Sequence, residues 1–137
     1  MKSVFADTHF WIAFLDARDP WHAKAGAISQ GLGRVWTVTT DAVLSEVLTF
    51  LSAYGVETRR RAAAFARGAL ARPDVEVVPQ TRETFLSALA LYEARPDKTY
   101  SLVDCLSMQI MRERRIRQIL THDQHFAQEG FTVLMRE

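Results

Sequence analysis

The chain has 137 residues, of which 48% are hydrophobic and 24% are charged, and this length and composition fit one globular domain with a substantial core. The formal net charge of +1 excludes a strong overall field of the kind that attracts nucleic acid or an anionic membrane surface. The single cysteine, Cys105, excludes an intrachain disulfide and a cysteine-rich metal cluster, which favours a reducing compartment.

Short apolar segments with strand composition alternate with longer helical patterns along the chain. Asp, Thr or Ser precedes several of the helical patterns and Gly or Pro follows several of them, as is typical of helix ends. In chain order we predict a strand over 4–6, helices over 8–16 and 21–31, a strand over 35–38, helices over 39–55 and 57–71, a strand over 75–78, helices over 81–94 and 101–115, a strand over 119–120, a short helix, and a strand over 131–134.

This alternation predicts an α/β protein, a three-layer α/β/α sandwich around a mainly parallel sheet, because parallel neighbours need helical crossovers that cover both faces. No repeat, low-complexity tract or linker interrupts the pattern, so we expect a single domain over residues 1–137. The chain starts without the apolar core of a signal peptide, and no apolar run approaches the roughly 18 residues of a membrane span. We therefore expect a cytoplasmic protein without a membrane partner.

Two aspartates directly follow predicted strands. Asp7 comes after the first strand and Asp123 comes shortly after the strand over 119–120. Ligands of open α/β sheets bind beyond the carboxyl ends of the strands, so both positions are candidates for a site. Each also has a structural interpretation: Asp7 could cap the next helix, and Thr121-x-x-Gln124 fits a capping box with Asp123 at a helix N-terminus.

Asp104 lies near the start of the helix predicted over 101–115. Ser101-x-x-Asp104 fits a capping box, so a local role for this carboxylate stays open. At about 100° per residue, however, Asp104 shares a face with Met108 and Met111, on the side away from the polar residues of the helix. An inward carboxylate is costly unless it is paired, hydrogen-bonded or bound to a cation, and no Lys or Arg lies one turn away on that side. This favours a functional role.

Glu46 lies at the shoulder of the apolar stripe of the helix that follows Thr39-Thr40. Alone it is best explained as a solvated residue, but all four carboxylates follow strands or project from helices beside them, so they can converge on one crevice. Four such charges would repel each other, and a hard divalent cation such as Mg²⁺ or Mn²⁺ removes that repulsion. Acidic clusters of this kind activate water and stabilise phosphoryl transition states, so the set indicates metal-assisted hydrolysis of a phosphodiester.

The same residues carry a resemblance to a known family. The segments "ADTHFWIAFLD", "TTDAVLSEVLTFL", "YSLVDCLSMQIM" and "THDQHF" supply Asp7, Glu46, Asp104 and Asp123 in that order over essentially the whole chain. In this order and spacing the chain resembles the PIN-domain ribonucleases, in particular the VapC-like toxins of bacterial toxin–antitoxin pairs.

The resemblance implies a PIN-like fold and an endoribonuclease that uses Mg²⁺ or Mn²⁺. It implies that all four carboxylates are catalytic and that Asp7, Asp104 and Asp123 bind the metal, with Thr121 and Ser101 in supporting roles. It also implies three partners: an RNA substrate, an antitoxin protein and a second copy of the chain in a homodimer.

The chain departs from the family pattern at positions that do not carry a carboxylate. His9 stands where Ser or Asn is common, Ser45 precedes Glu46 where Asn is frequent, and "RERRI" replaces a more usual Leu-Gly before the last core strand. The spacing of the four histidines matches no familiar ligand motif, so no histidine is assigned to the site. Four arginines form a basic run before the strand over 119–120: Arg112, Arg114, Arg115 and Arg117. Such a run is usually a solvated helix face, but because this one leads toward Asp123 it is a candidate for contacts with RNA phosphates.

Three other classes of protein have features that this sequence shares only in part. A phosphoacceptor receiver domain needs an acidic pair after the first strand and a late lysine, whereas Asp7 stands alone and His122 occupies the second neighbourhood. A haloacid-dehalogenase phosphatase needs Asp-x-Asp, and the residue two after Asp7 is His9. A non-catalytic PIN module that binds RNA or protein remains the main alternative, although no acidic residue is missing.

Overall fold

A computed structural model describes the protein over residues 1–137. A single parallel sheet forms its centre. Its five strands run in the order β3-β2-β1-β4-β5, and every neighbouring pair is parallel. The strands are β1 (Lys2–Ala6), β2 (Val35–Thr40), β3 (Val75–Val78), β4 (Gln118–Leu120) and β5 (Thr132–Val133).

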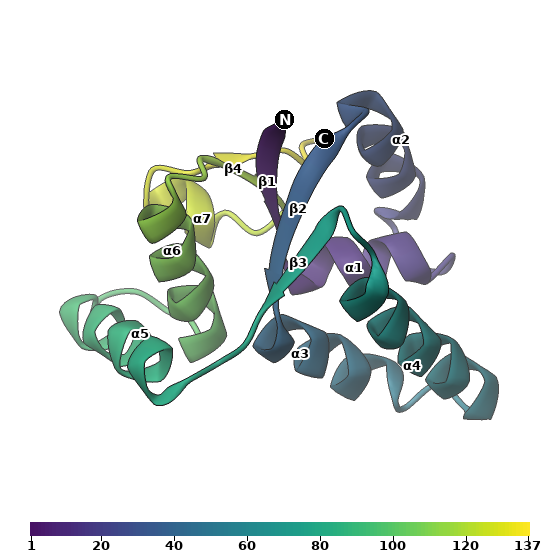
Figure 1. Ribbon diagram of the computed structural model, residues 1–137, viewed down its shortest axis with the longest axis horizontal. Helices are drawn as coiled ribbons and strands as arrows, with labels where there is room; N and C mark the ends of the chain where they lie inside the picture. Colours follow the sequence, from purple (N-terminus) through teal and green to yellow (C-terminus); the bar gives the residue numbers. More distant parts are fainter.

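Helices cover both faces of this sheet, with α1 to α4 on one side and α5 to α7 on the other (Figure 1). The α/β/α sandwich predicted from the sequence is therefore confirmed. None of the helices is long and apolar enough to span a membrane. The helices are α1 (Thr8–Leu15), α2 (His22–Leu32), α3 (Asp41–Leu51), α4 (Val56–Ala71), α5 (Arg82–Ala94), α6 (Leu102–Arg114) and α7 (His125–Gln128).

The core lies on the two central strands and the helices packed on them. Phe5 in β1, Ile119 in β4 and Met108 and Met111 in α6 are completely buried. Burial of each such side chain contributes about 1.5–3 kcal/mol, which fixes α6 against the centre of the sheet. Among the aromatic residues, Trp11 and Phe65 pack in or against the core, whereas Phe14 and Phe50 are 41% and 46% exposed.

The order of the strands creates a crevice beside β1. The chain moves outward from β1 to β2 and β3, and then crosses back to place β4 on the other side of β1. Ligands bind at such a reversal, beyond the carboxyl ends of the strands. Ala6 pairs with Leu120, and the Asp7 N–H donates to the Leu120 carbonyl at 3.1 Å. The residues that leave β1 and β4 therefore start side by side.

The C-terminal ends of α3 and α6 show features that the sequence did not predict. The helix predicted over 39–55 ends at Leu51, because residues 52–54 form a turn, and Gly55, with φ of +95°, becomes the residue that precedes α4. At the end of α6, Arg115 adopts the left-handed conformation with φ of 57°. This is the position that glycine usually occupies, so the departure "RERRI" places a strained residue there.

Candidate active site

A cleft of about 1280 Å³ opens at the carboxyl edge of the sheet and is lined by all four predicted carboxylates. Asp7 leaves β1, Asp123 follows β4, Glu46 projects from α3, and Asp104 lies in the first turn of α6. The fold thus brings together residues that are far apart in the chain, at the place where the strand order reverses.

Asp7 is the most buried of these carboxylates, with 2% of its surface exposed. It occupies the position before α1, but its side chain makes no capping hydrogen bond, so capping does not explain it. The Thr121 hydroxyl donates to its Oδ2 at 3.1 Å. Burial, followed by the charge of Asp104, raises the pKa of Asp7 to about 7, with Glu46 adding to the rise and hydrogen bonds from the Thr8 backbone and Thr121 opposing it. The fold therefore holds a carboxylate that lacks a compensating positive charge.

Thr121 also positions Asp123. Its Oγ1 accepts a hydrogen bond from the Asp123 N–H at 3.1 Å, and Asp123 Oδ1 in turn accepts one from the His125 N–H at 2.9 Å. The capping box that the sequence allowed between Thr121 and Gln124 does not form, because Gln124 itself precedes α7. One threonine therefore links the two strand-exit aspartates.

Asp104 has a local role and also faces the site. Its N–H donates to Ser101 Oγ and its Oδ2 accepts from the Ser101 N–H, both at 3.0 Å, so the capping box is complete. The same Oδ2 lies 3.3 Å from Nδ1 of His125. Ser101 therefore holds the Asp104 carboxylate at the start of α6, with one oxygen directed at the cleft.

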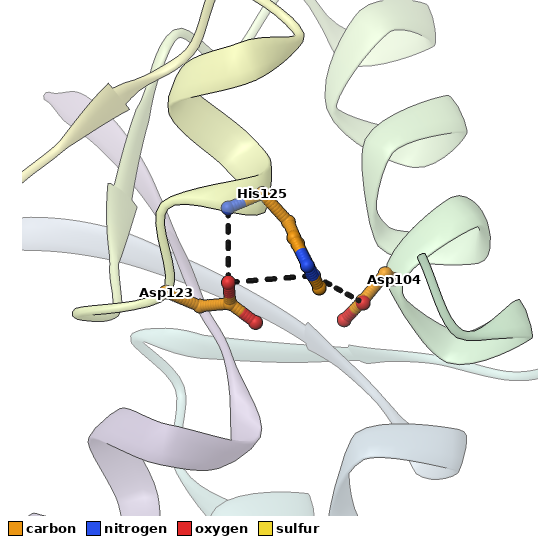
Figure 2. A group of neighbouring side chains, drawn as sticks. All are labelled: Asp104, Asp123 and His125. Atoms are coloured by element: carbon orange, nitrogen blue, oxygen red, sulfur yellow. Dashed lines mark hydrogen bonds and ion pairs between the residues drawn. The ribbon is translucent and has the colours of Figure 1, made fainter. Parts of the chain in front are cut away.

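His125 joins the site, although it was not among the residues predicted from the sequence. Figure 2 shows its ring between the two carboxylates, with Nδ1 at 3.3 Å from Asp104 Oδ2 and 3.4 Å from Asp123 Oδ1. His9 also approaches, with Nε2 at 3.7 Å from Asp123 Oδ2. The sequence feature that could have identified His125 is its position two residues after Asp123, where the turn before α7 directs its side chain back over the cleft.

Glu46 lies on the α3 side of the cleft. Its Oε1 accepts a hydrogen bond from the Thr8 hydroxyl at 2.6 Å. Thr8, which directly follows Asp7, therefore holds the Glu46 carboxylate in place.

The chemistry of the lining residues fits a divalent cation. Neither Lys nor Arg lines the cleft, so no permanently charged side chain balances its six acidic residues. Ligand atoms of Asp104, Asp123 and His125 lie within 4.8 Å of one another, close enough to share an ion. The metal ligands expected from the sequence included Asp7 in place of His125. The six acidic residues are Asp7, Asp19, Asp41, Glu46, Asp104 and Asp123.

The arginines predicted to contact RNA lie away from this cleft. Arg114 is ten residues beyond Asp104 on α6, or about 15 Å along the helix axis. Arg112 pairs with Glu129 and Arg114 pairs with Glu76, each at 2.6 Å. Arg115 and Arg117 are exposed at the same distant end of α6. The structure does not bring this run to the carboxylates.

Comparison with known proteins places this fold and cleft in a family. The model of the PIN domain matches residues 4–131, so the chain belongs to the PIN domain family, as the sequence motifs predicted. The chain is of the VapC type. It is 28% identical to the 23S rRNA-specific endonuclease VapC20 of Mycobacterium tuberculosis, in strains CDC 1551 and H37Rv, over 98% of this chain and 99% of that protein.

The likeness extends to three dimensions. The crystal structure of Mycobacterium tuberculosis VapC20, described as a sarcin-ricin loop cleaving toxin, matches with a TM-score of 0.87 and 28% identity. The match covers 97% of this chain and 99% of that one.

Proposed function

We propose that this protein is a metal-dependent endoribonuclease, the toxin of a toxin–antitoxin pair. The observation that carries the proposal is the acidic cleft without a Lys or Arg at the point where the strand order reverses. Such a cleft repels RNA phosphates until a cation balances it, and hard divalent ions prefer these carboxylate ligands. The match to VapC20 over nearly the whole chain supports the same activity.

The residues divide into three roles in this proposal. Asp7, Asp104 and Asp123 hold Mg²⁺ or Mn²⁺, which when bound supplies Lewis acidity and a more acidic water. The Thr121 hydroxyl donates to the Asp7 carboxylate and the Ser101 N–H donates to the Asp104 carboxylate, so these two residues keep two of the carboxylates in place. Glu46, held by Thr8, is the group available to orient a water molecule and take its proton.

The substrate we propose is ribosomal RNA. The VapC20 proteins carry 23S rRNA in their name, and the matched crystal structure is that of a toxin that cleaves the sarcin-ricin loop. The wide cleft, of about 1280 Å³, accommodates an RNA backbone with a nucleotide turned toward the carboxylates. We place this activity in the cytoplasm, in one PIN domain that spans residues 1–137.

The antitoxin and a second copy of the chain complete the proposal. A groove of about 700 Å³ between α1, α2 and α4 is lined by aromatic side chains that include Phe10, Trp11, Phe14 and Phe65, and it suits an amphipathic antitoxin helix. A basic antitoxin residue that reaches the acidic cleft would pair with the carboxylates in place of metal. The exposed Phe50 provides apolar surface for a homodimer.

Cleavage of purified ribosomal RNA with Mg²⁺, with Mn²⁺ and with EDTA tests this function. The wild-type protein should cut with either ion and not with EDTA, and Asp104→Asn should not cut with either ion. Asp97→Asn is the matched control, because Asp97 is an exposed loop carboxylate outside the cleft. RNA binding without cleavage by the wild-type protein would instead support a non-catalytic PIN module.

A further inference from the structure

We infer that His125 supplies a nitrogen ligand to the divalent cation, so that this site has mixed oxygen and nitrogen coordination and prefers Mn²⁺ to Mg²⁺. The inference rests on the proposed function, since it concerns the same cation. It assigns a role to the histidine between Asp104 and Asp123 that the four carboxylates alone do not explain (Figure 2).

The ring of His125 is oriented by contacts on the side away from the carboxylates. Its Nε2 lies 3.1 Å from the Thr99 hydroxyl, and its ring packs edge-to-face with Tyr100 at 5.3 Å between ring centres. Tyr100 is fixed in turn, because its hydroxyl donates to Glu129 at 3.0 Å. Histidines that bind metals typically have the second ring nitrogen held by a hydrogen bond of this kind.

Glu129 fixes Tyr100, and through it the ring of His125. Its carboxylate is 5% exposed and pairs with Arg95 at 2.9 Å and with Arg112 at 2.6 Å. These residues come from the end of α5, from α6 and from the end of α7, so the network ties together the elements that carry Asp104 and His125. The orientation of the ring is therefore built into the fold.

The Thr99 hydroxyl allows a neutral His125 ring to place its proton on either nitrogen, so that the ring can either donate to the carboxylates or offer a lone pair to a cation. A neutral imidazole carries one N–H, and a hydroxyl can either donate or accept. With the proton on Nδ1, the ring donates to the two carboxylates and Nε2 accepts from Thr99. With the proton on Nε2, the ring donates to Thr99, and the Nδ1 lone pair points between Asp104 and Asp123, where a cation shared by these carboxylates would lie.

A nitrogen ligand changes which ion this site prefers. Mg²⁺ strongly favours oxygen ligands, whereas imidazole suits transition metals. A site of carboxylates alone accepts Mg²⁺ and Mn²⁺ on similar terms. Addition of the His125 nitrogen strengthens Mn²⁺ binding and contributes little to Mg²⁺ binding.

Pulsed electron paramagnetic resonance of the Mn²⁺-loaded protein tests this coordination directly. The wild-type protein should show hyperfine coupling from a directly bound nitrogen, and His125→Phe, which keeps a ring against Tyr100, should lose it. His9→Gln serves as a control for the second histidine near Asp123, and His22→Gln serves as a control for a histidine outside the cleft, whose Nδ1 lies 2.8 Å from the Ala13 carbonyl. Both controls should retain the coupling.

Isothermal titration supplies the second measurement. His125→Phe should weaken Mn²⁺ binding by about tenfold and leave Mg²⁺ affinity nearly unchanged. Loss of nitrogen coupling in His9→Gln, equal losses for the two ions, or Mn²⁺ bound without nitrogen coupling in the wild-type protein would overturn the inference. If the wild-type protein binds Mn²⁺ without nitrogen coupling but still cleaves RNA, the inference fails and the proposed function stands. If the wild-type protein binds no divalent ion, both fail.

Discussion

Replacement of Asp7 by Asn should remove a contribution that makes the protein less stable as the pH rises. The folded protein holds the pKa of this carboxyl at about 7, against 3.8 for an ordinary aspartate, through burial and the charges of Asp104 and Glu46. Below pH 3.8 the group is protonated whether the chain is folded or not, so it makes no difference to stability. Between 3.8 and about 7 only the folded chain keeps the proton, and stability therefore falls as the pH rises.

The size of the effect follows from the same two pKa values. Each unit of pKa difference corresponds to about 1.4 kcal/mol, so ionised Asp7 reduces the free energy of unfolding by at most about 4 kcal/mol above pH 7. Asn keeps the shape and can still accept from Thr121, but it carries no charge. The difference in stability between Asp7→Asn and the wild-type protein should therefore grow in favour of the variant by up to this amount between pH 4 and 7.

Urea unfolding at several pH values, with EDTA present, measures this difference. Asp97→Asn is the control, because the Asp97 side chain is 73% exposed and lies outside the cleft. Saturating Mn²⁺ should reduce the advantage of Asp7→Asn, because a bound cation balances the carboxylate. If the unfolding free energies of Asp7→Asn and the wild-type protein run parallel from pH 4 to 7, the reasoning about a buried, uncompensated charge is wrong.

Four further variants test other parts of the structure. Asp123→Asn should abolish both Mn²⁺ binding by titration and RNA cleavage while the fold is kept; undiminished cleavage would remove this residue from the site. Glu129→Gln should destabilise the protein by about 2 kcal/mol at pH 7. Because the folded pKa of Glu129 is lowered to about 2 by Arg95 and Arg112, this loss should fade as the pH falls from 4.5 toward 2, as acid titration of both proteins will show. Arg115→Gly should raise the melting temperature, by relieving about 1 kcal/mol of left-handed strain, and a lowered one would contradict that view of the α6 end. If the exposed arginines contact RNA, Arg115→Gln with Arg117→Gln should flatten the salt dependence of RNA binding, and an unchanged slope would leave them as a solvated face.

The sequence predicted the frame of the site better than its details. Asp7 and Asp123 could be placed because strand exits on a parallel sheet meet at one edge, and the helical face of Asp104 could be read from its spacing to Met108 and Met111. These inferences depend only on local periodicity and on general rules of topology.

The features that escaped prediction depend on contacts between distant elements. His125 reaches Asp104 across 21 positions of the chain, and the direction of its ring is set by Thr99 and Tyr100, which no local pattern reveals. The basic run looked free in the sequence, but Arg114 pairs with Glu76 across 38 positions. The early end of α3 has a different cause: the sequence predicts a helix that runs to Gly55, whereas Gly55 is the residue that precedes the next helix, α4.

The bond between Thr121 and Asp7 joins positions 114 residues apart, and this separation has a consequence for how activity arises during folding. Closure of so long a loop is entropically expensive, and parallel pairings between distant strands form slowly. Until β4 docks beside β1, neither Thr121 nor Asp123 stands next to Asp7. Partly folded chains therefore lack an assembled catalytic centre, and nuclease activity should appear only at the final cooperative step of refolding, together with the native near-ultraviolet spectrum.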